Sequence, residues 1–131
     1  MSTYTIGDAA RAAGVTPRAI RLWESRGLMP ESDRTDSGYR VFTDADVEVL
    51  EFIRRGRGLG LSLDAIAEVM DIAASGEPCC DRTQSLLAQR VAEIDAAIVD
   101  LRRLRETVVV AQRAEVDQRA GARCAVIEAA G

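Results

Sequence analysis

The apolar residues of this chain recur at helical spacing in most segments, and strand-like alternation is scarce. Four helices are predicted in the first part of the chain, at residues 6–13, 17–26, 44–59 and 63–74. Each follows a hydroxyl residue that suits the N-cap position, namely Thr5, Thr16, Thr43 and Ser62. Gly14 and Gly27 suit the ends of the first two helices.

A short turn that contains Gly14 joins the first two predicted helices, which is the arrangement of a helix-turn-helix. The pattern changes between the second and third helices. Asp36-Ser37-Gly38 lies between extended residues there, as in the turn of a β-hairpin. We therefore expect a small hairpin, or wing, beside the second helix.

One long helix is predicted from Cys80 to about Arg113, after Gly76-Glu77-Pro78 interrupts the chain. The spacing of its large apolar residues is that of a heptad seam with one slip. These residues are Leu87, Val91, Ile94, Ile98, Leu101, Leu104 and Val108. Because the sequence contains no second helix of this length to cover the seam, we expect a homodimer with a coiled-coil interface.

The expected fold class is mainly all-α, in three parts. Residues 1–75 form a winged helix-turn-helix domain, residues 76–113 a hinge and dimerisation helix, and residues 114–131 a C-terminal loop and tail. In the tail, Gly121 marks a turn and Ala125-Val126-Ile127 is a short apolar piece. No apolar run is long enough to span a membrane and no apolar signal region is present, so we expect a cytoplasmic location.

The charged residues restrict the function classes. The net charge is −4 and all 17 basic residues are arginine. Acidic residues outnumber arginines within residues 1–72, so DNA binding requires arginines gathered on one face. Histidine is absent, which removes the commonest general base. With no glycine-rich phosphate loop and no paired catalytic signature either, an enzyme is not expected.

Several side chains suit contact with double-stranded DNA. Arg18 and Arg21, near the start of the second helix, are expected to be exposed and to reach base edges and phosphates in a major groove. Tyr39 and Arg40, at the tip of the wing, suit the DNA backbone or the minor groove. Arg54 belongs to a third arginine cluster, on the third helix.

The three cysteines do not suit a disulfide framework, because their number is odd and two are adjacent. A helix of about 33 residues is roughly 50 Å long, so Cys80 and Cys124 cannot meet within one chain. Antiparallel pairing of two long helices would bring them together. Thiolates suit mercury, cadmium, lead, zinc or monovalent copper. The alternative is a thiol that reacts with an oxidant or an electrophile without metal.

Six short motifs, in order over roughly residues 4–72, resemble the head of MerR-type transcriptional regulators. They are Thr5-Ile6-Gly7, Ala13-Gly14-Val15-Thr16, Ile20-Arg21-Leu22-Trp23-Glu24, Arg26-Gly27-Leu28, Ser37-Gly38-Tyr39-Arg40 and Leu59-Gly60-Leu61-Ser62-Leu63-Asp64-Ala65-Ile66. The resemblance continues through the long helix and the cysteine positions, as in the heavy-metal-responsive branch. Trp23 stands where the family usually has tyrosine. The candidate DNA-contacting residues are Thr16, Arg18, Arg21, Trp23, Tyr39, Arg40 and Arg54.

The resemblance implies a mechanism. Such regulators bind as homodimers to a palindrome between promoter elements that lie too far apart, and the inducer-bound dimer distorts this DNA to realign the elements for RNA polymerase. In metal-sensing relatives, one cysteine at the helix start and two in the tail loop hold the metal. Cys80 and Cys124 match the first and last of these. Glu115 stands near the place of the unmatched cysteine, with Asp117 close by, and Cys79 is the alternative third ligand.

Overall fold

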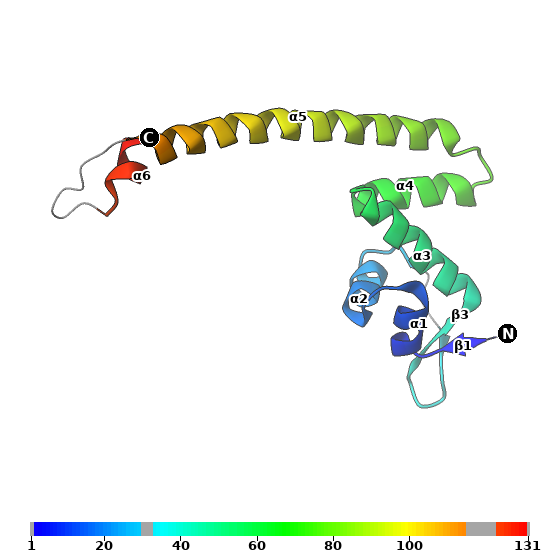
Figure 1. Ribbon diagram of the computed structural model, residues 1–131. Coiled ribbons are helices and arrows are strands. Elements are labelled where there is room, and N and C mark those ends of the chain that lie inside the picture. The colour runs from blue at the N-terminus through cyan, green and yellow to red at the C-terminus, as the bar shows by residue number, and fades with distance from the viewer. Residues whose placement is uncertain (1, 30–32, 115–122, 131) are drawn as a thin grey trace. The chain divides into compact units, whose positions relative to one another are not determined.

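The computed structural model describes residues 2–29, 33–114 and 123–130, and this part of the chain is mainly helical (Figure 1). The chain divides into two compact units, Met1–Leu87 and Ala88–Gly131. In the described ranges, no helix is both long enough and apolar enough to cross a membrane. The three-part division at residues 75 and 113 stays a prediction.

Helices α1 (Ile6–Ala13) and α2 (Pro17–Ser25) form the predicted helix-turn-helix. The hydroxyls of Thr5 and Thr16 each accept a hydrogen bond from the backbone N–H three positions further on, at 3.2 and 3.1 Å. These bonds satisfy N–H groups that have no partner within the helix. Gly14 ends α1 with φ 74°, a left-handed conformation that favours glycine. The helix-turn-helix prediction is therefore confirmed.

The predicted wing is also confirmed. Strands β2 (Asp33–Arg34) and β3 (Arg40–Thr43) pair antiparallel, and Gly38 turns the chain between them with φ 85°. Its N–H donates a hydrogen bond to the Thr35 carbonyl at 2.8 Å. A third strand, β1 (Thr3–Tyr4), pairs with the other edge of β3, so the sheet order is β1-β3-β2. The sequence did not predict β1, because two residues are too few to show strand alternation.

Helices α3 (Asp44–Gly58) and α4 (Leu63–Ala74) begin at their predicted caps. Thr43 and Asp46 form a capping box, in which each side chain accepts a hydrogen bond from the other residue's backbone N–H, at 3.2 and 2.9 Å. Both helices pack in the core of the first unit. The largest fully buried side chains of this core are Phe42, Ile20, Leu50, Ile53 and Ile66.

Helix α5 (Cys80–Arg113) has the bounds that the sequence predicts. Most of its apolar seam is exposed in the single chain: Val91 is 57% exposed, Ile94 43%, Ile98 41%, Leu101 64%, Leu104 58% and Val108 57%. The seam therefore lacks a covering surface within the described chain. A short helix, α6 (Ala125–Ala129), follows in the tail, where the sequence indicated only an apolar piece.

Candidate DNA interface and candidate metal site

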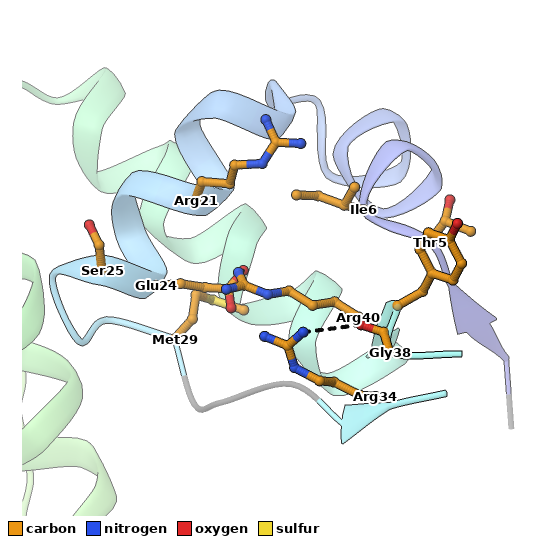
Figure 2. A pocket seen from close by; sticks show the side chains of 10 residues that line it. Thr5, Ile6, Arg21, Glu24, Ser25, Met29, Arg34, Gly38 and Arg40 are labelled. Atoms are coloured by element: carbon orange, nitrogen blue, oxygen red, sulfur yellow. Dashed lines mark hydrogen bonds and ion pairs between the residues drawn. The ribbon is translucent and has the colours of Figure 1, made fainter. Parts of the chain in front are cut away.

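A groove separates α2 from the wing (Figure 2). Its volume is about 670 Å³. The residues that line it are Thr5, Ile6, Arg21, Glu24, Ser25, Met29, Arg34, Gly38, Tyr39 and Arg40. The structure thus brings together three predicted DNA contacts, Arg21, Tyr39 and Arg40. Tyr39 is 74% exposed.

Arg34 is a lining residue that the sequence analysis missed. It lies directly across the hairpin from Arg40, as their strand register shows. Like charges in such a pair repel each other. The Arg34 guanidinium donates a hydrogen bond to the Gly38 carbonyl at 3.0 Å, which orders it at the groove (Figure 2). The hairpin pattern alone could have indicated this arginine, because a turn centred on Asp36-Ser37-Gly38 sets residue 34 opposite residue 40.

Arg40 also holds the wing to α2. Its Nη1 lies 2.7 Å from Oε1 of Glu24, whose side chain is 10% exposed, against 38% for that of Arg40. A partly buried ion pair of this length fixes the wing against the helix more firmly than an exposed pair would. The Arg40 charge is consequently shared between this contact and the groove. Thr5, which the sequence indicated only as a helix cap, and Ser25, which it did not single out, also line the groove.

The other predicted DNA contacts lie outside the groove lining. Arg18 is exposed near the start of α2, and Thr16 uses its hydroxyl oxygen to cap this helix. Arg54 is exposed on α3, but its Nε donates a hydrogen bond to the Ala13 carbonyl at 3.0 Å and so ties α3 to the end of α1. Trp23 is only 7% exposed and belongs to the hydrophobic core. It lies in the same buried cluster as residues of α1 and α3, which leaves little of its ring for DNA.

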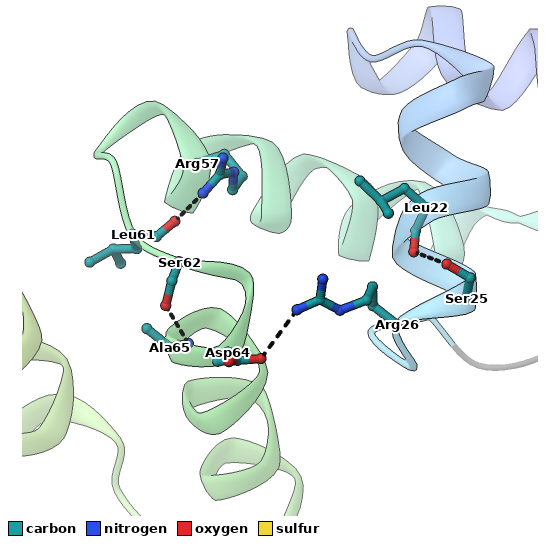
Figure 3. A network of polar contacts seen from close by, with 8 residues as sticks. All are labelled: Leu22, Ser25, Arg26, Arg57, Leu61, Ser62, Asp64 and Ala65. Carbon is teal, nitrogen blue, oxygen red and sulfur yellow. Dashed lines mark hydrogen bonds and ion pairs between the residues drawn. The ribbon is translucent and has the colours of Figure 1, made fainter.

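Polar contacts also lie at the end of α2 and in the turn between α3 and α4 (Figure 3). Arg26, at the end of α2, lies 3.6 Å from the Asp64 carboxylate at the start of α4. Arg57 donates a hydrogen bond to the Leu61 carbonyl at 2.8 Å and so closes the turn between α3 and α4. Because an exposed ion pair contributes little to stability, the helix that carries Arg18 and Arg21 is held mainly by its buried face, which includes Ile20 and Trp23.

The cysteines are free thiols. Cys80 is exposed as the first residue of α5. Cys79 is half-buried and packs against the core. Cys124 is half-buried at the N-cap of α6, and its side chain makes no capping hydrogen bond. All three sulfurs are thus chemically suited to a soft metal.

Each cysteine belongs to one unit: Cys79 and Cys80 to the first, Cys124 to the second. Within the described residues of a single chain, no three cysteine or carboxylate side chains gather as a metal site. Glu115, the predicted alternative ligand, lies outside the described residues, as does Asp117. The predicted ligand set therefore stays a prediction.

An ion pair joins the start of α5 to α4. Arg82 Nε donates to Glu68 Oε1 at 2.7 Å, and Arg82 Nη2 donates to Oε2 at 3.0 Å. These hydrogen bonds hold the pKa of the Glu68 carboxyl below its usual range and raise the pKa of the Arg82 guanidinium. The bidentate geometry orients both groups. The first turn of α5, which begins at Cys80, is thereby fastened to the head.

The sequence matches two family descriptions, "MerR HTH family regulatory protein" over residues 4–72 and "MerR, DNA binding" over residues 47–111. The HTH-type transcriptional regulator ZntR of Escherichia coli K12 is 35% identical over 106 residues, which cover 80% of this chain and 75% of ZntR. The mercuric resistance operon regulatory protein of Serratia marcescens is 34% identical over 109 residues, covering 83% of this chain and 74% of that protein.

Two solved structures of transcription regulators are also similar to this chain. The regulator PbrR691 of Ralstonia metallidurans CH34, in complex with lead(II), has a TM-score of 0.81 and 25% identity, and the match covers 98% of this chain and 99% of that one. HiNmlR, a MerR family regulator bound to promoter DNA, has a TM-score of 0.60 and 26% identity, with 86% and 88% covered. These proteins are regulators rather than enzymes. The chain belongs to the MerR family of helix-turn-helix transcriptional regulators, whose members bind operator DNA as homodimers, and it aligns with the metal-responsive branch of that family.

Proposed function

We propose that this protein is a cytoplasmic transcriptional activator that is induced by a soft heavy-metal ion. The metal is held between two chains by Cys80 of one and Cys124 of the other, with Cys79 or Glu115 as a third ligand. The observation that carries this proposal is the placement of thiols before and after a single long helix. At about 1.5 Å per residue, the 34 residues of α5 extend roughly 51 Å.

The donor chemistry supports a soft ion. Histidine is absent from the sequence, so sulfur is the strongest class of donor that the chain offers. Mercury, cadmium, lead, zinc and monovalent copper are the candidates. The similarity to a mercuric resistance regulator and to a regulator in complex with lead(II) favours this class.

Metal binding at the cysteines would act on the DNA through α5 and the head. Metal at Cys80 constrains the first turn of α5, which the Arg82–Glu68 pair fastens to α4 and so to the head. The head then bends and untwists the palindromic operator, which realigns the promoter elements for RNA polymerase. Such deformation costs roughly 1–6 kcal/mol. The metal must favour the distorting state by a similar amount.

Transcription in vitro from a dyad promoter, with a panel of metals, tests the proposal. Cys80→Ser and Cys124→Ser should each abolish metal-induced transcription and leave the gel shift of operator DNA unchanged, because the groove between α2 and the wing contains no cysteine. Ser85→Ala, at an exposed position of α5, is the matched control and should respond as the unsubstituted chain does. Full induction of either cysteine variant would contradict metal binding at these thiols.

A second candidate function is thiol sensing without metal, and the exposure of Cys80 favours it. In this case peroxide or an aldehyde would induce transcription in buffer that contains a chelator. Under metal sensing, a chelator instead reverses induction and the oxidant has no inducing effect. Measured side by side, the two responses separate the candidates.

A further inference from the structure

The start of α5 is attached to the rest of the first unit by two different contacts. Leu86 is 7% exposed and belongs to the hydrophobic core of this unit. One turn earlier, the Arg82 guanidinium donates to both carboxylate oxygens of Glu68 in α4, at 2.7 and 3.0 Å. Residues four positions apart lie on the same face of a helix. Arg82 and Leu86 therefore hold one face of α5 against the head, which comprises α1 to α4 and the wing.

These two contacts constrain different movements of α5. The hydrophobic effect is non-directional, so burial of Leu86 keeps α5 against the core and by itself sets the rotation of the helix only loosely. A bidentate pair between a planar guanidinium and a carboxylate adds geometric specificity, because its two hydrogen bonds form together only over a narrow range of orientations. The Arg82–Glu68 pair therefore sets the orientation of the first turn of α5 on α4.

Cys80 lies in this same turn. It is the exposed first residue of α5, two positions before Arg82. At about 3.6 residues per turn, two positions are roughly 200° apart around the helix axis, so Cys80 and Arg82 project from nearly opposite sides of the turn. An inducer that pulls on Cys80 consequently moves the turn that the ion pair holds. Because Leu86 is buried, it is the fixed point about which this turn moves.

Helix α4 is placed to pass such a movement on. Ile66, two residues before Glu68, is 1% exposed and packs closely on α3, since a β-carbon at Gly56 would lie 2.8 Å from its Cδ1 atom. Helix α3 is in turn joined to the end of α1, where Arg54 donates to the Ala13 carbonyl at 3.0 Å. Close-packed interiors transmit displacement because they are hard to compress. A movement of α4 therefore reaches the helix-turn-helix.

We propose that Glu68 and Arg82 are positioning residues for induction. Their ion pair transmits the displacement of the first turn of α5, caused by an inducer at Cys80, to the DNA-binding head. This inference rests on the proposed function for its inducer site, and it holds for a metal ion and for a reactive thiol alike. Neither residue lines the groove between α2 and the wing, and neither is a proposed metal ligand. Without the pair, inducer and operator should each still bind, but one binding event would no longer affect the other.

The exposure of the pair makes this role separable from a structural one. Both side chains are 44% exposed. Exposed ion pairs add little to stability, so removal of this pair should leave the fold intact. Coupling makes a smaller demand, because the pair need only favour one orientation of α5 over another. A variant that lacks the pair is therefore expected to be folded and uncoupled.

Arg82→Gln and Glu68→Gln, made in the full chain, test the coupling. The probe is the metal ion alone, chosen as the ion to which the unsubstituted chain responds most strongly in the transcription panel. Charge-transfer absorbance of the thiolates gives the affinity for the ion, and anisotropy without the ion gives the affinity for the operator. Fluorescence of 2-aminopurine at the centre of the dyad reports operator distortion. Both affinities should stay within about threefold of the unsubstituted chain, whereas the ion-dependent changes in fluorescence and transcription should fall at least about fivefold.

Three further variants separate geometry from charge and from general damage. Arg82→Lys keeps the charge without the planar fork, and should lose coupling as Arg82→Gln does. The exchange Glu68→Arg/Arg82→Glu rebuilds an ion pair of reversed polarity and should recover at least about half of the induction. Glu51→Gln is the matched control. It removes a carboxylate that lies 3.7 Å from Arg55 within α3, where the pair joins no two elements, and it should keep full induction.

Full ion-dependent distortion and transcription in Arg82→Gln or Arg82→Lys would overturn the proposal, and so would an equal loss in Glu51→Gln. A larger loss of either affinity would assign the pair a merely structural role and would also overturn it. Failure of the proposed function is distinct, because the unsubstituted chain then responds to no ion. The same variants are in that case compared with peroxide as inducer in buffer that contains a chelator, where retained induction overturns the coupling role. If neither inducer acts on the unsubstituted chain, both proposals fall.

Discussion

At the scale of single residues, the arginines of the wing have divided roles. Arg40 contacts Glu24 and so holds the wing to α2, while Arg34 is ordered at the groove by the Gly38 carbonyl. Neither contact uses all five donors of a guanidinium. Two arginines facing each other across a hairpin are favourable when an anion lies near both. A DNA phosphate is such an anion.

Arg34→Gln should therefore weaken operator binding and lower its dependence on salt. The loss of one phosphate contact reduces the slope of log K against log salt by about 1, roughly equally for specific and nonspecific DNA. Fluorescence anisotropy over a range of salt concentrations measures this slope. Arg113→Gln, at the exposed end of α5, is the charge-matched control and should keep the slope. Equal slopes for both variants would exclude Arg34 from the interface.

At the scale of elements, close packing of α3 on α4 depends on one glycine. A β-carbon at Gly56 would lie 2.8 and 2.9 Å from the Cδ1 and Cγ1 atoms of Ile66, which is fully buried. Gly58, two residues later in the same helix, has open space around the corresponding position. Although both glycines belong to α3, only Gly56 lies too close to a neighbouring side chain to accept a β-carbon.

Alanine at these two positions should have opposite effects. Gly56→Ala should destabilise the protein by about 1–3 kcal/mol, because overpacking outweighs the gain in helix propensity. Gly58→Ala should be neutral or stabilising by up to about 1 kcal/mol. Urea denaturation followed by circular dichroism gives both free energies of unfolding. Stabilisation by Gly56→Ala would show that α3 and α4 separate easily.

The elements of this fold were largely predictable because their ends carry local chemistry. Caps such as Thr43 and Ser62 and the glycine at residue 14 fix helix bounds through neighbouring backbone groups alone. The groove was less predictable. The contact of Arg40 with Glu24 and the burial of Trp23 depend on how α2 meets the wing and the core, and spacing along the chain does not contain that information. The thiol positions were visible in the sequence, whereas the proposed partners of these thiols belong to a second chain or lie outside the described residues.

At the scale of the whole molecule, the single chain is incomplete. The seam of α5 exposes six large aliphatic side chains, which a stable monomer rarely shows; they are Val91, Ile94, Ile98, Leu101, Leu104 and Val108. The proposed dimer would bury them. Operator recognition needs two heads, so it depends on the same interface.

Leu101→Asp should consequently weaken both dimerisation and operator binding, because it places a charge in the buried seam. Ala96→Asp introduces the same charge in the same helix, two positions after Ile94 and away from the seam, and should leave both unchanged. Analytical ultracentrifugation gives the dimer dissociation constant, and gel shift gives operator affinity. The interface lies elsewhere if the two aspartates have equal effects.

The exposed apolar seam of α5 also links the response to metal to the abundance of the protein. In the proposed arrangement, a newly made chain has neither a complete operator-binding surface nor a complete set of metal ligands until it dimerises. Both abilities would then rise with the square of its concentration while copies are scarce. A cell that holds only a few molecules would neither read its promoter nor capture the ion, so the level of expression would set the threshold of detection.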